Sequence, residues 1–184
     1  MKKVLDIVFK KDFSSLFCTQ FLGAFNYNLF RSVLVAYIAG SLVHISLTNR
    51  GIIATFIALA VYLLSTLIFS MPGGEVADKY SKTQVIKTIV FTQIISALLI
   101  CLGLHLKSAF ILYFTLVILG AQNAFFMPVK YALLPQILKK NQLISANGLL
   151  ETGLYGSILV SAIVCGIYTP SKPSELTILS IIII

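Results

Sequence analysis

The chain has 184 residues, of which 58% are hydrophobic and only 11% are charged, and its formal net charge is +8. A globule of this length cannot bury so much apolar side chain, which excludes a soluble domain and makes the lipid bilayer the solvent of the chain. The positive charge does not indicate a nucleic-acid partner, because the basic residues gather at the ends of the apolar segments.

Five apolar segments follow one another, separated by short polar connections. A helix rises about 1.5 Å per residue, so about 20 apolar residues span the roughly 30 Å hydrocarbon core of a bilayer. This predicts an all-α, polytopic membrane protein with five complete transmembrane helices. The predicted spans are residues 13–43, 52–72, 86–106, 108–129 and 143–169.

A shorter apolar segment closes the chain. Pro170 and Pro173 end the fifth span, and residues 176–184 then make only about 13 Å of helix, which is too little to cross a bilayer. We interpret this segment as the beginning of a truncated sixth span. Residues 1–184 are therefore predicted to form a partial N-terminal six-helix bundle of a longer protein.

The distribution of basic residues predicts the orientation. With a cytoplasmic N-terminus, ten basic residues lie inside and three outside, which is the positive-inside bias of membrane proteins. The inside residues are Lys2, Lys3, Lys10, Lys11, Lys79, Lys82, Lys87, Lys130, Lys139 and Lys140, and the outside residues are Arg50, Lys107 and Lys172.

The first span carries a polar stripe. Gln20, Ala24, Asn28 and Arg31 follow one another at spacings of four, four and three, so they share one helical face. An arginine deep in a bilayer costs about 2.5–3.5 kcal/mol on insertion scales unless it faces a cavity, a partner charge or the interface. Arg31 is therefore predicted either to line a cavity or to extend to the outer membrane surface.

The connection between the second and third spans reads GGEVADKYSK. Gly73 and Gly74 are predicted to end the second helix. Asp78 is expected to cap the next helical turn or to pair with a neighbouring helix end. Lys79 and Lys82 then keep this connection cytoplasmic.

The fourth span ends in GAQNAFFMPVKYALLP. Gln122 and Asn123 place uncharged polar groups near its middle. Pro128 and Pro135 predict irregular backbone beside Lys130, because proline frees backbone carbonyls. Lys130 is expected either at a substrate site or as an anchor that meets lipid phosphates.

The fifth span has its own stripe of Asn147, Glu151 and Tyr155 at spacings of four. Beside it Gly148, Thr152 and Gly156 form a ridge of small residues, which predicts the close approach of another helix. Glu151 is the single acidic residue within the five spans, so it is expected to pair with Arg31, or else to stay protonated or facing water, bonded to helix neighbours.

The cysteines Cys18, Cys101 and Cys165 each lie in an apolar span, which predicts packing and neither a disulfide nor a metal site. The sequence has no paired catalytic groups and no phosphate-cradling loop. We therefore predict no cofactor, no metal and no enzymatic activity.

Four stretches carry a resemblance to a known family. GEVADKYSK resembles the cytoplasmic loop motif of the major facilitator superfamily, with Gly74, Asp78, Lys79 and Lys82 at matching positions and Ser81 in place of a glycine. The stretches FLGAFNYNLF, PVKYALLP and ANGLLETG, in this order, are similar to the bacterial lysophospholipid transporter branch, which also occurs fused to an acyltransferase and acyl-ligase.

The resemblance implies most of the N-terminal half of a twelve-span transporter. Such a protein moves lysophospholipid from the outer to the inner leaflet of a bacterial inner membrane by alternating access. A separately encoded C-terminal half is then the expected partner of this chain. It implies candidate cavity-lining residues at Asn28, Lys130, Asn147 and Glu151, to which the polar stripes add Gln20, Arg31 and Asn123. The loop residues Gly74, Asp78, Lys79 and Lys82 would belong to a conformational switch.

Tyr27 departs from the family pattern, since it occupies the position of the aspartate in the first span. A phenol with an ordinary pKa of about 10 cannot bind a coupling cation as an anion. Two alternatives therefore stand beside the lysophospholipid transporter. The first is a general major facilitator transporter of solutes or drugs, and the second is a non-transporting remnant or half-transporter partner.

Overall fold

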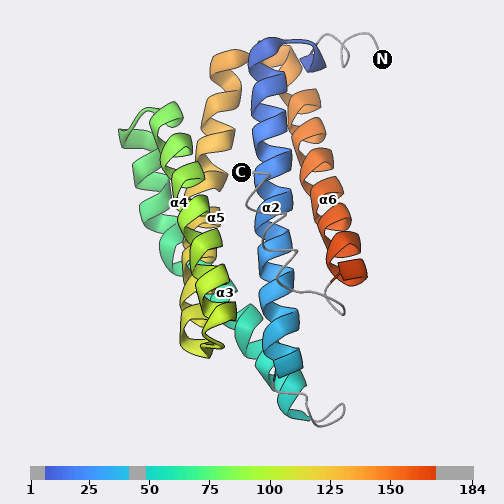
Figure 1. Ribbon diagram of the computed structural model, residues 1–184. Coiled ribbons are helices and arrows are strands. Elements are labelled where there is room, and N and C mark those ends of the chain that lie inside the picture. Colours follow the sequence, from blue (N-terminus) through green and yellow to red (C-terminus); the bar gives the residue numbers. More distant parts are fainter. Residues whose placement is uncertain (1–6, 42–48, 169–184) are drawn as a thin grey trace.

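The computed structural model describes residues 7–41 and 49–168, and every regular element among them is helical (Figure 1). This confirms the all-α prediction. The elements are α2 (Lys11–Ser41), α3 (Asn49–Lys79), α4 (Lys82–His105), α5 (Ala109–Ile137), the short 3₁₀ helix η1 (Lys140–Gln142) and α6 (Leu143–Tyr168).

Four helical segments within the described residues are long and apolar enough to cross a membrane: 55–79, 82–105, 109–137 and 140–167. Helix α2 has 31 residues, or about 46 Å, but its polar stripe interrupts its apolar sequence and it is not among the four. The predicted sixth span, 176–184, lies outside the described residues. The count of five complete spans and a truncated sixth therefore stays a prediction.

Gly73 and Gly74 do not end the second helix, contrary to expectation. Helix α3 continues through Pro72 and both glycines to Lys79. Helix propensity is a weak guide that tertiary packing overrides, and here Gly73 packs directly against the Ala124 backbone of α5.

The irregular backbone predicted beside Lys130 is also absent. Helix α5 runs without a break from Ala109 to Ile137 and includes Pro128 and Pro135. Neighbouring helices and local adjustment accommodate proline in membrane helices, so its effect on helix continuity is smaller than in a soluble protein.

The helices pack as two groups. Helix α2 packs chiefly against α6, while α3 and α4 both pack against α5. Helix α2 also contacts α3, whereas α5 and α6 touch each other at only a few points. An apolar cluster joins α2 to α3, α4 and α5 through buried residues that include Phe30, Ala58, Ile100 and Leu116.

Two glycines of the α3–α5 contact allow backbones to approach closely. A Cβ atom added at Gly120 of α5 would lie 2.6 Å from the carbonyl oxygen of Tyr62, and one added at Gly73 of α3 would lie 2.6 Å from that of Ala124. Beside Gly120, the Ser65 hydroxyl donates a 2.6 Å hydrogen bond to the Val117 carbonyl. Small residues and hydroxyl bonds thus hold α3 against α5.

The ridge predicted on α6 is only partly placed as expected. An added Cβ would meet nothing within 4 Å at Gly148, and at Gly156 it would lie 3.8 Å from the Phe21 ring. The closest approach is at Gly153 instead, where an added Cβ would lie 2.6 Å from the Phe17 ring of α2. Phe17 and Phe21 of α2 therefore contact α6 on the face that carries Gly153 and Gly156.

The helix ends that carry the predicted inside lysines lie at one end of the bundle (Figure 1). The start of α2, the turn between α3 and α4 and the turn between α5 and α6 all meet there. A 2.9 Å hydrogen bond from Lys10 Nζ to Gln142 Oε1 joins two of these ends.

We predict that Gly120→Ala lowers the thermal stability of the detergent-solubilised chain. The added methyl group overlaps the Tyr62 carbonyl and the Ser65 side chain, and overpacking of this kind costs about 1–3 kcal/mol. Gly148→Ala is the matched control, since its methyl group meets open space. Equal melting temperatures for the two variants, measured by fluorescence-detected thermal unfolding, would contradict this packing.

Candidate functional site

A cavity of about 210 Å³ lies between α2, α3, α4, α5 and α6. It is lined by many polar side chains although the bundle around it is apolar. These are Thr19, Gln20, Tyr27, Asn28, Arg31, Tyr62, Gln93, Gln122, Asn123 and Lys130. Most of the wall area is nevertheless apolar, and a largely apolar hollow with a few placed polar groups resembles a small-ligand site, although its volume is below the roughly 300–1,000 Å³ of ordinary ligand sites.

The polar stripe of α2 faces this cavity. Gln20, Ala24, Asn28 and Arg31 all line it, as the helical spacing indicates. Gln20 is buried and its amide nitrogen donates a 2.8 Å hydrogen bond to the Leu150 carbonyl of α6. Asn28 is buried too and donates to the Ala24 carbonyl at 2.7 Å.

Arg31 does not pair with Glu151, so that expectation is wrong. Its guanidinium carbon lies 5.5 Å from the ring centroid of Tyr62 and 6.0 Å from that of Tyr27, within the range of cation–π contact. Gln20 contacts α6 at the level of Leu150, and Arg31 lies eleven residues, or about 16 Å, farther along α2. The two charges are therefore at different depths of the bundle.

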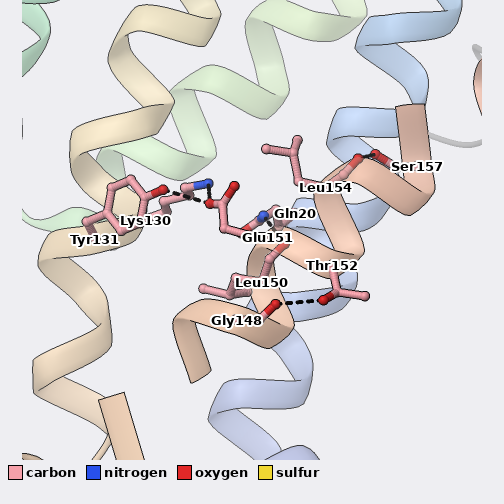
Figure 2. Close-up of polar contacts among 9 residues, drawn as sticks. All are labelled: Gln20, Lys130, Tyr131, Gly148, Leu150, Glu151, Thr152, Leu154 and Ser157. Atoms are coloured by element: carbon pink, nitrogen blue, oxygen red, sulfur yellow. Dashed lines mark hydrogen bonds and ion pairs between the residues drawn. The ribbon is translucent and has the colours of Figure 1, made fainter. Parts of the chain in front are cut away.

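Glu151 pairs with Lys130 instead, as Figure 2 shows. The distance from Lys130 Nζ to Glu151 Oε1 is 3.0 Å, and the Tyr131 hydroxyl donates to the same carboxylate oxygen at 2.7 Å. This is the one salt bridge among residues 7–41 and 49–168. It joins α5 to α6, two helices that make few other contacts.

The two partners of this salt bridge differ in exposure. The Lys130 side chain is 1% exposed and lines the cavity, whereas the Glu151 side chain is 33% exposed. Lys130 therefore does not extend to lipid phosphates as an anchor. Its ammonium group also lies 4.6 Å from the ring centroid of Tyr131.

Asn123 lines the cavity, but Asn147 and Glu151 are not among its lining residues. Asn147 is exposed on α6, one turn before Glu151, and Tyr155 is exposed one turn after it. The α6 stripe therefore points away from the cavity, and Glu151 connects to it only through Lys130.

Three buried polar atoms of the cavity lining lack a hydrogen-bond partner in the described structure. They are Gln20 Oε1, the Tyr27 hydroxyl and Gln122 Oε1. Buried polar groups are usually bonded to protein or to water, so these fully buried, unpaired atoms on residues that line the cavity could pair with a polar ligand or with water only after a side-chain movement that exposes them.

Two polar residues that line the cavity, Tyr62 and Gln93, were not among the candidates predicted from the sequence. Gln93 is an amide within an apolar span, a signal that could have found it, since polar residues in spans usually face the bundle interior. Tyr62 gave no such signal, because a tyrosine in a span is also an ordinary packing residue.

The proposed switch loop is short and exposed. Asp78 and Lys79 form the end of α3, and Ser81, not Asp78, is the N-cap of α4, which begins at Lys82. Lys79 lies over the neighbouring Tyr80 ring at 5.8 Å, and Gly74 lies inside α3.

Within the described part of the chain no group of three His, Cys, Asp or Glu side chains could hold a metal ion.

We predict that Glu151→Gln destabilises the chain more than Lys130→Met. The first variant leaves the buried Lys130 ammonium without its counter-charge, which costs about 1–3 kcal/mol, whereas the second leaves a carboxylate that is partly exposed. Thermal unfolding of both variants and of the double variant checks this. A Lys130→Met variant less stable than Glu151→Gln would contradict the assigned burial.

Comparison with known proteins shows where this fold belongs. The model of the Major Facilitator Superfamily matches residues 16–183. The chain is 31% identical over 156 residues to the lysophospholipid transporter LplT of Serratia proteamaculans (strain 568) and 30% identical over 156 residues to that of Yersinia pestis (strain Pestoides F). It is 34% identical over 119 residues to the lysophospholipid transporter LplT of Pectobacterium carotovorum subsp. carotovorum (strain PC1). No solved structure matches.

The coverage of these matches is unequal. The first relative matches 83% of this chain, but the chain spans only 35% of that relative, and the Pectobacterium match covers 65% of this chain and 25% of the relative. The chain thus spans about a third of the length of its curated relatives. By its family match and its apolar helices, the chain belongs to the Major Facilitator Superfamily, and it is a multi-pass membrane protein of a transporter family rather than an enzyme.

Proposed function

We propose that this chain takes part in moving a lysophospholipid across a bacterial inner membrane, with the lipid headgroup held in the cavity. The observation that carries the proposal is a polar hollow with an arginine and a lysine inside an apolar helix bundle. The names of the relatives point to the same class of substrate.

Arg31 is the group that we assign to the headgroup phosphate. No described carboxylate lies within ion-pair distance of its guanidinium group, which contacts the faces of Tyr27 and Tyr62. Planar guanidinium groups bind phosphate oxygens in a bidentate manner. The tyrosine rings lower the cost of the buried positive charge and leave its N–H donors free for an anion.

Lys130 supplies a second positive charge, which is paired with Glu151 and which we propose also binds the phosphate. It lines the cavity and is bonded to Glu151. A phosphate that moves along the cavity from the depth of Arg31 to that of Lys130 competes there with the carboxylate for the ammonium group, so its arrival weakens the main polar link between α5 and α6. This gives substrate binding a route to the relative position of these helices, as alternating access requires.

The rest of a complete transporter would come from a second polypeptide segment. Transporters of this family alternate between two halves that rock about a site near the middle of the membrane. We therefore propose a C-terminal half as partner, with the N-terminus of this chain in the cytoplasm. The orientation is supported by Lys11, Lys79, Lys82 and Lys140, since each stands at the end of a helix and these helix ends lie at one end of the bundle (Figure 1).

The transport test uses proteoliposomes that contain the chain alone, or the chain together with the C-terminal half of the Serratia proteamaculans relative. Leaflet-resolved flipping of labelled lysophosphatidylethanolamine is measured in both. We expect binding in both preparations and flipping only with the second half present. Absence of lysophospholipid binding, or equal activity on an unrelated cationic drug, would contradict the proposal.

We predict that Arg31→Gln weakens lysophosphatidylethanolamine binding about 10- to 100-fold. Loss of one charge-assisted contact costs about 1.5–3 kcal/mol, and each 1.4 kcal/mol is tenfold in affinity. Arg31→Lys keeps the charge and should recover part of the affinity. Affinity is measured by microscale thermophoresis in nanodiscs, with Lys107→Gln, outside the cavity, as the control. Equal affinities for Arg31→Gln and the control would remove Arg31 from the site.

A further inference from the structure

A second hollow of about 600 Å³ lies between α3, α4 and α5. Its volume is within the roughly 300–1,000 Å³ of ordinary ligand sites. Its wall is largely apolar, and its lining residues include Phe69, Val85, Phe114, Val117 and Ala121.

The threonines in this wall do not make it polar. The Thr88 hydroxyl donates to the Gln84 carbonyl at 3.0 Å, and the Thr92 hydroxyl donates to the Ile89 carbonyl at 2.8 Å. Both hydroxyls are thus satisfied by the backbone of α4. A hollow of this kind in a membrane bundle is a place for hydrocarbon and not for water.

The apolar groove and the polar cavity are adjacent, because Ile89 and Gln122 line both. Gln122 is 6% exposed, and its amide nitrogen donates a 2.9 Å hydrogen bond to the Ser96 hydroxyl. That bond fixes the amide, while the Oε1 atom has no partner in the described structure. Gln122 therefore stands at the junction between the two hollows and carries an unpaired acceptor that is covered by neighbouring atoms, so a ligand reaches it by a small movement of the amide.

We propose that the groove holds the single acyl chain of the transported lipid and that Gln122 Oε1 accepts a hydrogen bond from the free glycerol hydroxyl. This inference rests on the proposed function and extends it. A lysophospholipid carries a phosphate headgroup, one hydroxyl and one chain on the same glycerol. The cavity, the junction and the groove offer a place for each in that order.

The arrangement also distinguishes one-chain from two-chain lipids. A diacyl phospholipid has no free glycerol hydroxyl to donate to Gln122, so the buried acceptor stays unpaired when it binds. Its second chain would have to enter the polar cavity and cover the charged groups of Arg31 and Lys130. Both effects favour the lysophospholipid.

The first test locates the acyl chain of the bound lipid. A lysophosphatidylethanolamine with a diazirine on its acyl chain is irradiated with the wild-type chain in nanodiscs, and the labelled residues are identified by mass spectrometry. We expect labelling at Thr88, Val117 and Ala121 that excess unlabelled lysophosphatidylethanolamine removes. Equal labelling of these residues by a diacyl probe with the same diazirine would show an ordinary membrane-lipid contact and overturn the assignment.

The second test separates the two compartments. Ala121→Trp fills the groove, and Leu98→Trp, on an exposed part of α4 outside both hollows, is its control. We expect Ala121→Trp to weaken lysophosphatidylethanolamine binding about tenfold while binding of water-soluble glycerophosphoethanolamine is unchanged. If Ala121→Trp weakened the binding of both ligands, or of neither, the assignment of the groove to the acyl chain would be wrong. A wild-type chain that binds neither ligand would contradict the proposed function itself.

The third test addresses the hydroxyl. Wild-type affinity for lysophosphatidylethanolamine is compared with that for its analogue with the glycerol hydroxyl methylated. We expect a preference of about tenfold for the free hydroxyl, and a ratio near one in Gln122→Leu. Gln93→Leu, another amide of the cavity that lies away from the groove, should keep the preference. A preference unchanged in Gln122→Leu would overturn the role of this residue.

Discussion

Polar side chains in a helix bundle surrounded by hydrocarbon have to find their partners inside the bundle, and this constraint shapes the interior, although Asn147 and Tyr155 of α6 are exposed. Water is not available at the lipid-facing surface, and an unpaired polar group there costs several kcal/mol. Gln20, Asn28 and Gln122 are accordingly buried, although each belongs to a helix that also has an exposed apolar face. The polar cavity is the result of this constraint acting on several helices at once.

The cavity lies where the two groups of helices meet. Close backbone contacts at Gly73 and Gly120 hold α3 against α5, and the Phe17 ring against Gly153 holds α2 against α6. Between the groups the link from α5 to α6 is mainly the Lys130–Glu151 salt bridge. Apolar clusters at both ends of α2 also join the two groups, through Phe30 and Leu116 at one end and through Phe13, Leu134 and Leu150 at the other, so the salt bridge is the polar part of a largely apolar interface.

The helices and the polar face of α2 could be predicted from the sequence, because both depend on local features. Hydropathy places the helices, and a spacing of 3.6 residues per turn places Gln20, Asn28 and Arg31 on one face. The ends of helices were less predictable. Gly73 disfavours a helix and Pro128 and Pro135 would break or kink one in water, but the packed helices continue through all three.

The pairing of charges could not be predicted, since it depends on which helices are neighbours and at what depth. Arg31 and Glu151 are the obvious opposite charges within spans, yet Lys130 on α5 is the residue at the level of Glu151. Tyr62 lines the cavity from α3, and nothing in the sequence separates it from an ordinary packing residue, whereas the Gln93 amide within an apolar span is a signal that could have found it. The proximity of the apolar groove to the polar cavity likewise depends on how α4 and α5 are placed, which no local pattern contains.

The central claim, that polar side chains of α2 and α5 face an interior open to a hydrophilic ligand, can be tested by cysteine accessibility. In a variant without Cys18, Cys101 and Cys165, single cysteines are placed at Asn123 in the cavity and at Leu98 on the exposed apolar part of α4. A membrane-impermeant maleimide should label the Asn123 position, with lysophosphatidylethanolamine slowing the reaction, and should leave the Leu98 position unlabelled. Equal labelling of the two positions, or labelling at Asn123 that the lipid does not change, would contradict the account.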